Sequence, residues 1–86
     1  SLLRALGLDV KTAVVASWQC NLTRKLTVEV QDHTLIPLIR PNASALLALT
    51  FPADWNVKGV IVTARAPAGQ QYDFVSRYFG PWNGID

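Results

Sequence analysis

The sequence of 86 residues has a single cysteine, a single histidine and no methionine. Cys20 alone cannot form a disulfide within the chain, and Cys20 with His33 provides too few ligands for a zinc site. We therefore expect no metal and no cofactor. We also expect a reducing, cytoplasmic environment, because secreted domains of this size commonly rely on disulfides.

Charge and long apolar runs are also scarce. Only 16% of the residues are charged, and the eight basic residues are scattered, with Arg24 and Lys25 as the one adjacent pair. A net charge of +2 without a basic patch predicts that nucleic acid is not a partner. No apolar run approaches the roughly 20 residues that span a bilayer, so we expect no membrane association either.

Hydrophobic residues, in contrast, make up 50% of the chain. The length suits one small domain, residues 1–86, and a chain of this size buries only about 60 to 65% of its unfolded surface on folding. The sequence therefore has more apolar surface than a domain of this size buries on folding. Some of that surface is expected to face a partner.

Hydrophobic periodicity and capping residues predict three short helices, four strands and two turns. Ser1, Asp32 or Thr34, and Asn42 are suited to cap short helices, whereas strict alternation in residues 25–31 is typical of a strand. The predicted helices begin at these caps, the first covering residues 1–8, and the predicted strands are residues 12–19, 25–31, 57–66 and 71–79. Residues 20–24 and 67–70 are expected to be turns.

This order of elements predicts an α+β fold of about four mainly antiparallel strands with short helices on one face. Residues 57–66 are apolar on both faces, which favours a central place in the sheet. The second face is expected to carry Trp18 and Phe79 without a layer over them. Such a face needs another layer or another chain to cover it.

Three segments of the C-terminal third carry a family resemblance. Residues 57–64 read VKGVIVTA, residues 72–81 read YDFVSRYFGP, and residues 84–86 read GID. They resemble the phenazine-biosynthesis-like (PhzF-type) isomerase family, whose domains have the diaminopimelate-epimerase-like fold. Residues 38–42 with the leucines that follow, and residues 26–32, are similar to the family's preceding helix pair and strand.

The resemblance implies a partial domain. Family members are longer chains of two similar domains with the active site in the cleft between them, and this chain resembles the first part of the second domain. The catalytic glutamate comes from the first domain, and the E-D-P-V-T-G-S-A-H motif follows the point reached by Asp86, so neither is in this sequence. We expect a truncated domain that is catalytically inactive alone.

Ser76 and Arg77 are the candidate substrate-binding residues. The resemblance places them in a strand that runs up to the cleft, where the Arg77 guanidinium would hold an anionic group in a complete enzyme. An ion pair between Arg77 and Asp73 on the same strand is the interpretation we favour over substrate binding. No catalytic residue is assigned.

Four other reactive side chains are expected to play no chemical role. Glu29 and Asp32 are interpreted as solvated, His33 has no nucleophile beside it in the sequence, and Cys20 has no adjacent basic residue. Proton transfer at carbon, the family's reaction type, needs an acid and a base on opposite sides of the substrate. The sequence does not supply such a pair.

These observations favour a protein that associates with a second copy of itself, as a homodimer, through the sheet face or an edge strand. Two alternatives stay open. The chain is a segment of an active isomerase or epimerase completed by other chains, or it is a binding module for a small anionic ligand at a homodimer interface.

Overall fold

The computed structural model describes residues 1–9, 11–69 and 73–83. Four strands form one mixed sheet in the order β1-β2-β3-β4. The strands are β1 (Val14–Cys20), β2 (Lys25–Val30), β3 (Val60–Arg65) and β4 (Phe74–Phe79). β1 and β2 pair antiparallel, as do β3 and β4, whereas β2 and β3 pair parallel. The expected α+β architecture of four mainly antiparallel strands is confirmed.

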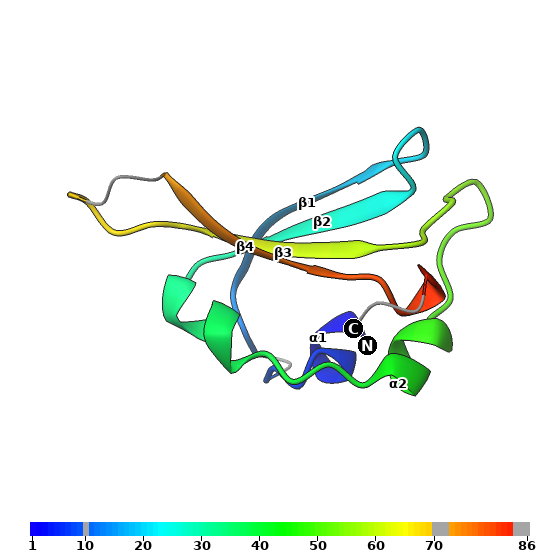
Figure 1. The fold of residues 1–86 in the computed structure, drawn as a ribbon, viewed down its shortest axis with the longest axis horizontal. Helices are drawn as coiled ribbons and strands as arrows, with labels where there is room; N and C mark the ends of the chain where they lie inside the picture. Colours follow the sequence, from blue (N-terminus) through cyan, green and yellow to red (C-terminus); the bar gives the residue numbers. More distant parts are fainter. Residues whose placement is uncertain (10, 70–72, 84–86) are drawn as a thin grey trace.

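Short helices form a second layer on one face of the sheet (Figure 1). They are α1 (Leu2–Ala5), the 3-10 helix η1 (His33–Leu38), α2 (Ala43–Leu47) and the 3-10 helix η2 (Pro81–Asn83). The first three begin at the predicted caps: Ser1 accepts from the Arg4 amide, Asp32 from that of Thr34, and Asn42 from that of Ala45. Each cap satisfies an amide that has no partner within its helix.

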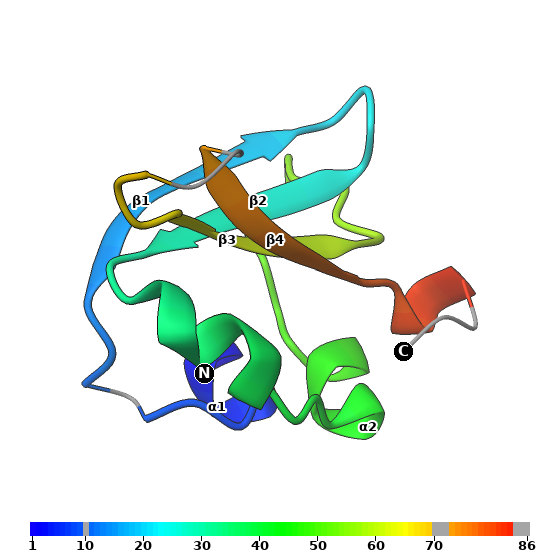
Figure 2. The same cartoon turned by 60° about the vertical axis from the view of Figure 1, so that its left-hand side comes forward.

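The parallel pairing of β2 with β3 explains how the layers are connected. Parallel strands cannot be joined by a tight turn, so the chain must cross from one end of the sheet back to the other. η1 and α2 lie in this crossover, which carries the chain over one face of the sheet (Figure 2). β3 consequently has a neighbour on both sides, which confirms the central position that its apolar sequence predicts.

The core lies between the helix layer and the sheet face beneath it. On this face the side chains of Val28 and Val62 are buried, and Ile36 of η1 and Leu46 of α2 pack against the same cluster. Phe79 is also fully buried here. The expectation that Phe79 lies on the uncovered face is therefore wrong, because it pairs with Val60 and shares the inward face of that residue.

Backbone hydrogen bonds fasten α1 to the segment that leads into α2. The Arg40 amide donates to the Leu6 carbonyl and the Asn42 amide donates to the Ala5 carbonyl. Gly7, which directly follows Leu6, has a φ of +74°, and a Cβ at that position would lie 2.7 Å from the Arg40 carbonyl oxygen. Only glycine fits this left-handed, tightly packed position.

The observed elements are shorter than the predicted ones. The first helix covers Leu2–Ala5 rather than residues 1–8, and the strand predicted over 57–66 begins at Val60. The residues just before Val60 form backbone hydrogen bonds with the start of β2. The Lys58 amide donates to the Arg24 carbonyl, and the Leu26 amide donates to the Gly59 carbonyl. Parts of the predicted 71–79 strand and 67–70 turn, and the 84–86 motif, lie outside the described residues.

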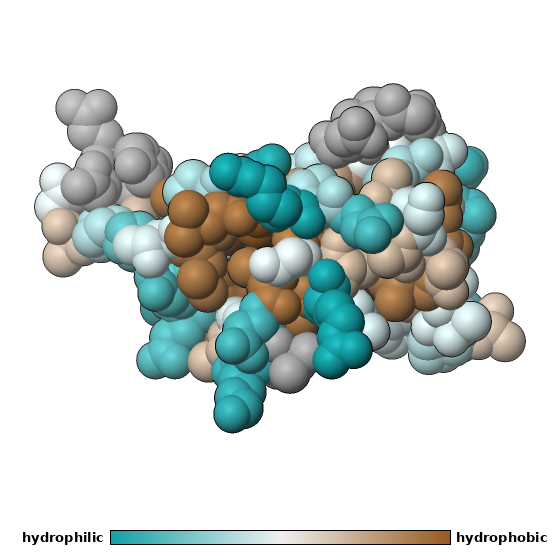
Figure 3. All heavy atoms as spheres, turned by 90° about the horizontal axis from the view of Figure 1, so that it is seen from below, coloured by the Kyte–Doolittle hydropathy of each residue, from teal (hydrophilic) through white to brown (hydrophobic). Residues whose placement is uncertain are grey.

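The outer surface of the helix layer is mixed in character. Figure 3 shows hydrophobic atoms between hydrophilic side chains on this side of the molecule. Leu38 of η1 is 59% exposed, and Leu47 of α2 is about half exposed. Within the described residues no helix is both long enough and apolar enough to cross a membrane.

Two residues of η1 test which side of this short helix stabilises the fold. Ile36 is 1% exposed, so Ile36→Val should lower the free energy of unfolding by about 1 kcal/mol. Leu38→Ala removes more atoms but from an exposed position, and should change it by less than about 0.5 kcal/mol. Urea unfolding followed by circular dichroism measures both values. Equal losses for the two variants would contradict the packing described.

Candidate functional site on the open face of the sheet

The sheet face that points away from the helices has no described element over it (Figure 1). We call it the open face. Strand register assigns to it twelve side chains, those of Ala16, Trp18, Cys20, Lys25, Thr27, Glu29, Ile61, Thr63, Arg65, Phe74, Ser76 and Tyr78. It contains Ser76, one of the two candidate residues, and it is the opposite face from that of the core.

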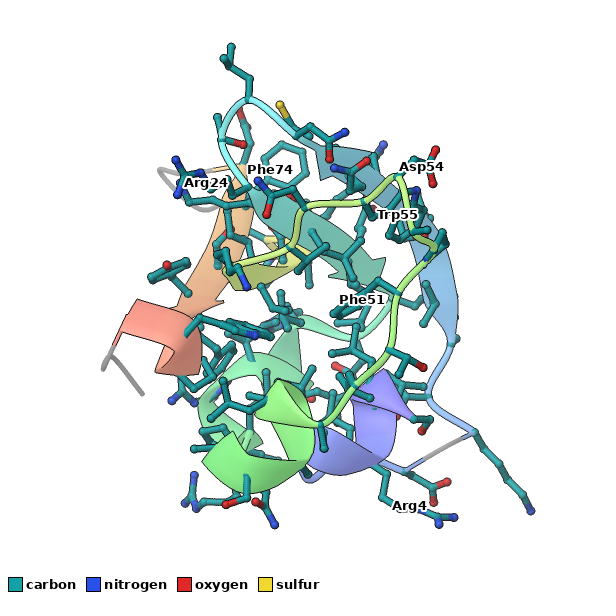
Figure 4. The ribbon with its side chains drawn as sticks, turned by 90° about the vertical axis from the view of Figure 1, so that its right-hand side faces the viewer. Arg4, Arg24, Phe51, Asp54, Trp55 and Phe74 are labelled. Atoms are coloured by element: carbon teal, nitrogen blue, oxygen red, sulfur yellow. The ribbon has the colours of Figure 1, made fainter. Side chains whose placement is uncertain are left out.

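A shallow hollow of about 310 Å³ lies on the open face and is lined from all four strands. Glu29, Thr63 and Ser76 form one row across β2, β3 and β4. Trp18 and Phe74, from the two edge strands, border the hollow and are 51% and 52% exposed. Figure 4 shows Phe74 on the side of the sheet away from the helices.

The hydroxyl of Ser76 is engaged in a short chain of hydrogen bonds. Ser76 Oγ donates to Thr63 Oγ1 at 2.8 Å, and Thr63 Oγ1 donates to the Val75 carbonyl at 3.2 Å. A nucleophilic serine needs a base to accept its proton, whereas here the proton points to another hydroxyl. The pair therefore suits polar contact with a bound molecule rather than covalent chemistry.

Glu29 gives the hollow a negative charge. Its side chain is largely buried, so the expectation that Glu29 is solvated is wrong: the residue is enclosed by its neighbours in the central strands. Glu29 Oε2 lies 3.7 Å from Nε of Arg65, whose own side chain is 79% exposed. An exposed guanidinium at this distance compensates the carboxylate only weakly. The hollow therefore suits an apolar or cationic group better than the small anion expected from the sequence, which stays a prediction.

Arg77 lies on the opposite face of β4 from Ser76. Its Nη1 donates to the carbonyls of Ile36 and Ile39 at 3.1 and 3.2 Å, and its guanidinium lies 5.0 Å from the centre of the Phe79 ring. The two candidate residues are thus not brought together. Arg77 joins β4 to η1 instead.

The ion pair expected between Arg77 and Asp73 does not form. Residues four apart on a strand are separated by about 13 Å, beyond the reach of an aspartate and an arginine that do not bend back. The proposed pair followed from their common strand face, but a shared face does not imply contact along an extended chain.

The remaining acidic and basic candidates are dispersed. Asp32 lies beyond the end of β2 and accepts hydrogen bonds from the hydroxyl and then the amide of Thr34, which lower the pKa of its carboxyl below the usual value. Glu29 faces the hollow, and His33 begins η1. Among the described residues no three histidine, cysteine or acidic side chains gather to hold a metal ion.

Cys20 has a basic neighbour, Lys25, that is not adjacent to it in the sequence. Its exposed thiol receives hydrogen bonds from the hydroxyl and amide of Thr23 and from the amide of Leu22, and these lower its pKa. Lys25, directly opposite in the β1–β2 hairpin, adds a smaller effect in the same direction. The hairpin register supplies this neighbour, whereas a search for adjacent residues misses it.

The segment between α2 and β3 links the helix layer to the hairpin. Phe51 and Trp55 stack with ring centroids 6.4 Å apart, and both lie on this connecting segment (Figure 4). The Asn21 side chain in the hairpin turn donates to the Asp54 carbonyl and accepts from the Asn56 amide. These hydrogen bonds attach the turn between β1 and β2 to the segment that leads into β3.

Known proteins resemble most of this chain. An uncharacterized isomerase of Pseudomonas aeruginosa is 42% identical over 64 residues, which are 74% of this chain and 21% of that protein. Phenazine biosynthesis-like domain-containing proteins of Mus musculus and Rattus norvegicus are 38% and 36% identical over 69 residues, 73% of this chain and 23% of theirs. The chain thus spans about a fifth of the length of these relatives. No family model and no solved structure matches it.

The position of Arg77 predicts a structural effect on mutation. Arg77→Gln should lower the free energy of unfolding by about 1 to 3 kcal/mol, because two carbonyls lose a charged donor. Arg65→Gln is the matched control and should cost less than about 1 kcal/mol, since that side chain is mostly in water. Thermal and urea unfolding compare the two variants, and equal effects would contradict a linking role for Arg77.

The lowered pKa of Cys20 predicts its reactivity. The thiolate is the form that reacts, so alkylation by iodoacetamide should reach half its maximal rate at a lower pH in the folded chain than in urea. Thr23→Val removes the leading hydrogen bond and should move this midpoint to higher pH. Identical midpoints for the folded chain, the variant and the unfolded chain would show that the turn does not act on the thiol.

Proposed function

Because the chain belongs to the phenazine biosynthesis-like family, we propose that it is a structural segment of an isomerase-type protein that completes its sheet by associating with a second copy. The sheet corresponds in this proposal to the first part of the second domain of the PhzF-type fold. The observation that carries the proposal is a sheet packed on one face only, with an open face bordered by half-exposed Trp18 and Phe74.

The exposed surface area and the radius of gyration support a domain that lacks part of its structure. The chain exposes 5547 Å², whereas a compact protein of its mass exposes about 5,000 Å². Its radius of gyration is 12.8 Å, against about 12 Å for a compact domain of this length. Both differences have the sign expected for a sheet that lacks one covering layer.

The placement of the ionisable side chains supports a structural rather than a catalytic role for this stretch. Glu29 faces the open face, Arg77 faces the core side, and Asp32 caps a helix. Proton transfer at carbon requires an acid and a base directed at one substrate from two sides. In this proposal the acid and the base of the whole protein lie in the remaining four fifths of the length that its relatives have.

Light scattering after size exclusion tests the association. At tens of micromolar the chain should run at twice its 9.4 kDa mass and melt cooperatively by circular dichroism. Dilution should lower both the mass and the melting temperature, because a second copy stabilises only the folded state.

A well-folded monomer at this concentration would overturn the proposed association. A monomer with a broad, uncooperative melt would instead favour the alternative in which other chains of an isomerase complete the domain. Both results are read from the same sample, so the two alternatives are separated in one experiment.

A further inference from the structure

The strand β1 forms one edge of the sheet and is, of the four described strands, the one least protected against pairing with another strand. Figure 2 shows it along the outer margin, with β2 on its inner side. Five of its seven residues are exposed and the other two are partly exposed. An edge strand presents a row of unpaired amide and carbonyl groups, which another strand satisfies.

β1 also lacks charge, which the other three strands have. Lys25 and Glu29 lie in β2, Arg65 in β3 and Arg77 in β4, whereas β1 reads VVASWQC. Charged side chains, proline and bulges are the usual means of protecting an edge. The one such feature in β1 is a register shift between Val14 and Ala16, and the pairing from Ala16 to Cys20 is regular.

The opposite edge is better covered. η1 packs against β4, and the Arg77 side chain bridges the two. The residue after the strand is Gly80, followed by Pro81, which has no amide hydrogen to donate. Of the two edges within the described sheet, β1 is therefore the one suited to receive another strand.

We propose that residues 16–20 of β1 pair antiparallel with the same residues of a second copy, so that two sheets join into one of eight strands. The inference rests on the proposed association and names its interface. Two-fold antiparallel pairing of a strand with itself brings a charge close to its own symmetry mate when it lies next to the axis, here at Trp18, and like charges across strands are unfavourable. Within this segment there is no charge to oppose the pairing.

The two faces of β1 provide variants that distinguish this interface from pairing through the open face. Ser17 is exposed and lies on the helix side, since it pairs with the buried Val28. Phe74 lies on the open face at the far edge of the sheet. A charge at position 17 therefore acts on β1 pairing, and a charge at position 74 acts on packing of the open face.

Light scattering and sedimentation measure the dimer dissociation constant of the chain and four variants. Ser17→Lys and Ser17→Glu should each raise it about tenfold. In this register residue 17 lies opposite residue 19 of the second copy, so the two charges at position 17 are diagonal neighbours about 7 Å apart and repel each other. An equimolar mixture of the two should recover dimers, since the opposite charges then attract. Phe74→Asp, and Leu22→Lys in the hairpin turn as the control for added charge, should leave the constant within about twofold.

The outcomes distinguish pairing through β1 from the proposed self-association on which it rests. A dimer that Ser17→Lys leaves intact and Phe74→Asp dissociates overturns β1 pairing but retains self-association. A monomeric parent chain overturns both. Loss of dimers in both Ser17 variants, with recovery on mixing and no loss in Phe74→Asp, is the result expected from β1 pairing.

Discussion

The parallel pairing of β2 with β3 determines where the other elements lie. A parallel pair requires the chain to return along the whole length of the strands, and here the return passes through η1 and α2 over a single face. Once that face is covered, Val28, Val62 and Phe79 are buried beneath it. The other face and the β1 edge receive no described element, so the same constraint that builds the core also leaves two surfaces uncovered.

These uncovered surfaces differ in chemistry. The open face has a hydroxyl pair and a carboxylate at its centre and aromatic side chains at its borders, so it is neither a dry core nor an ordinary solvated surface. The β1 edge offers backbone hydrogen bonds and no charge. Backbone pairing depends little on side-chain fit, whereas packing on the open face would need to accommodate Glu29. The edge is for this reason the simpler surface for a second copy.

Local features of the sequence predicted much of this fold. Capping side chains placed the starts of α1, η1 and α2, and the apolar run from Val60 placed β3 at the centre of the sheet. The family resemblance, carried by residues 57–64 and 72–81, is confirmed by relatives that are up to 42% identical. These features depend on neighbours in the sequence, which a single chain displays directly.

Features that depend on pairing across the sheet were not predictable in the same way. Phe79 was placed on the wrong face, because alternation shows that two sets of residues face apart but not which set meets the helices. The partners of Arg77 are the carbonyls of Ile36 in η1 and of Ile39 directly after it, about 40 positions away in sequence, and the basic neighbour of Cys20 comes from the hairpin register. The face of Phe79 and the partners of Arg77 and Cys20 become evident only once the pairing of the strands and the packing of η1 are known.

Hydrogen exchange of the β1 amides at several protein concentrations tests the central claim most directly. If the sheet continues through β1 into a second copy, amides in residues 16–20 that face away from β2 gain protection as concentration rises, while those of β3 stay protected throughout. Protection in β1 that is independent of concentration, with outward amides exchanging freely in the most concentrated sample, would contradict the account.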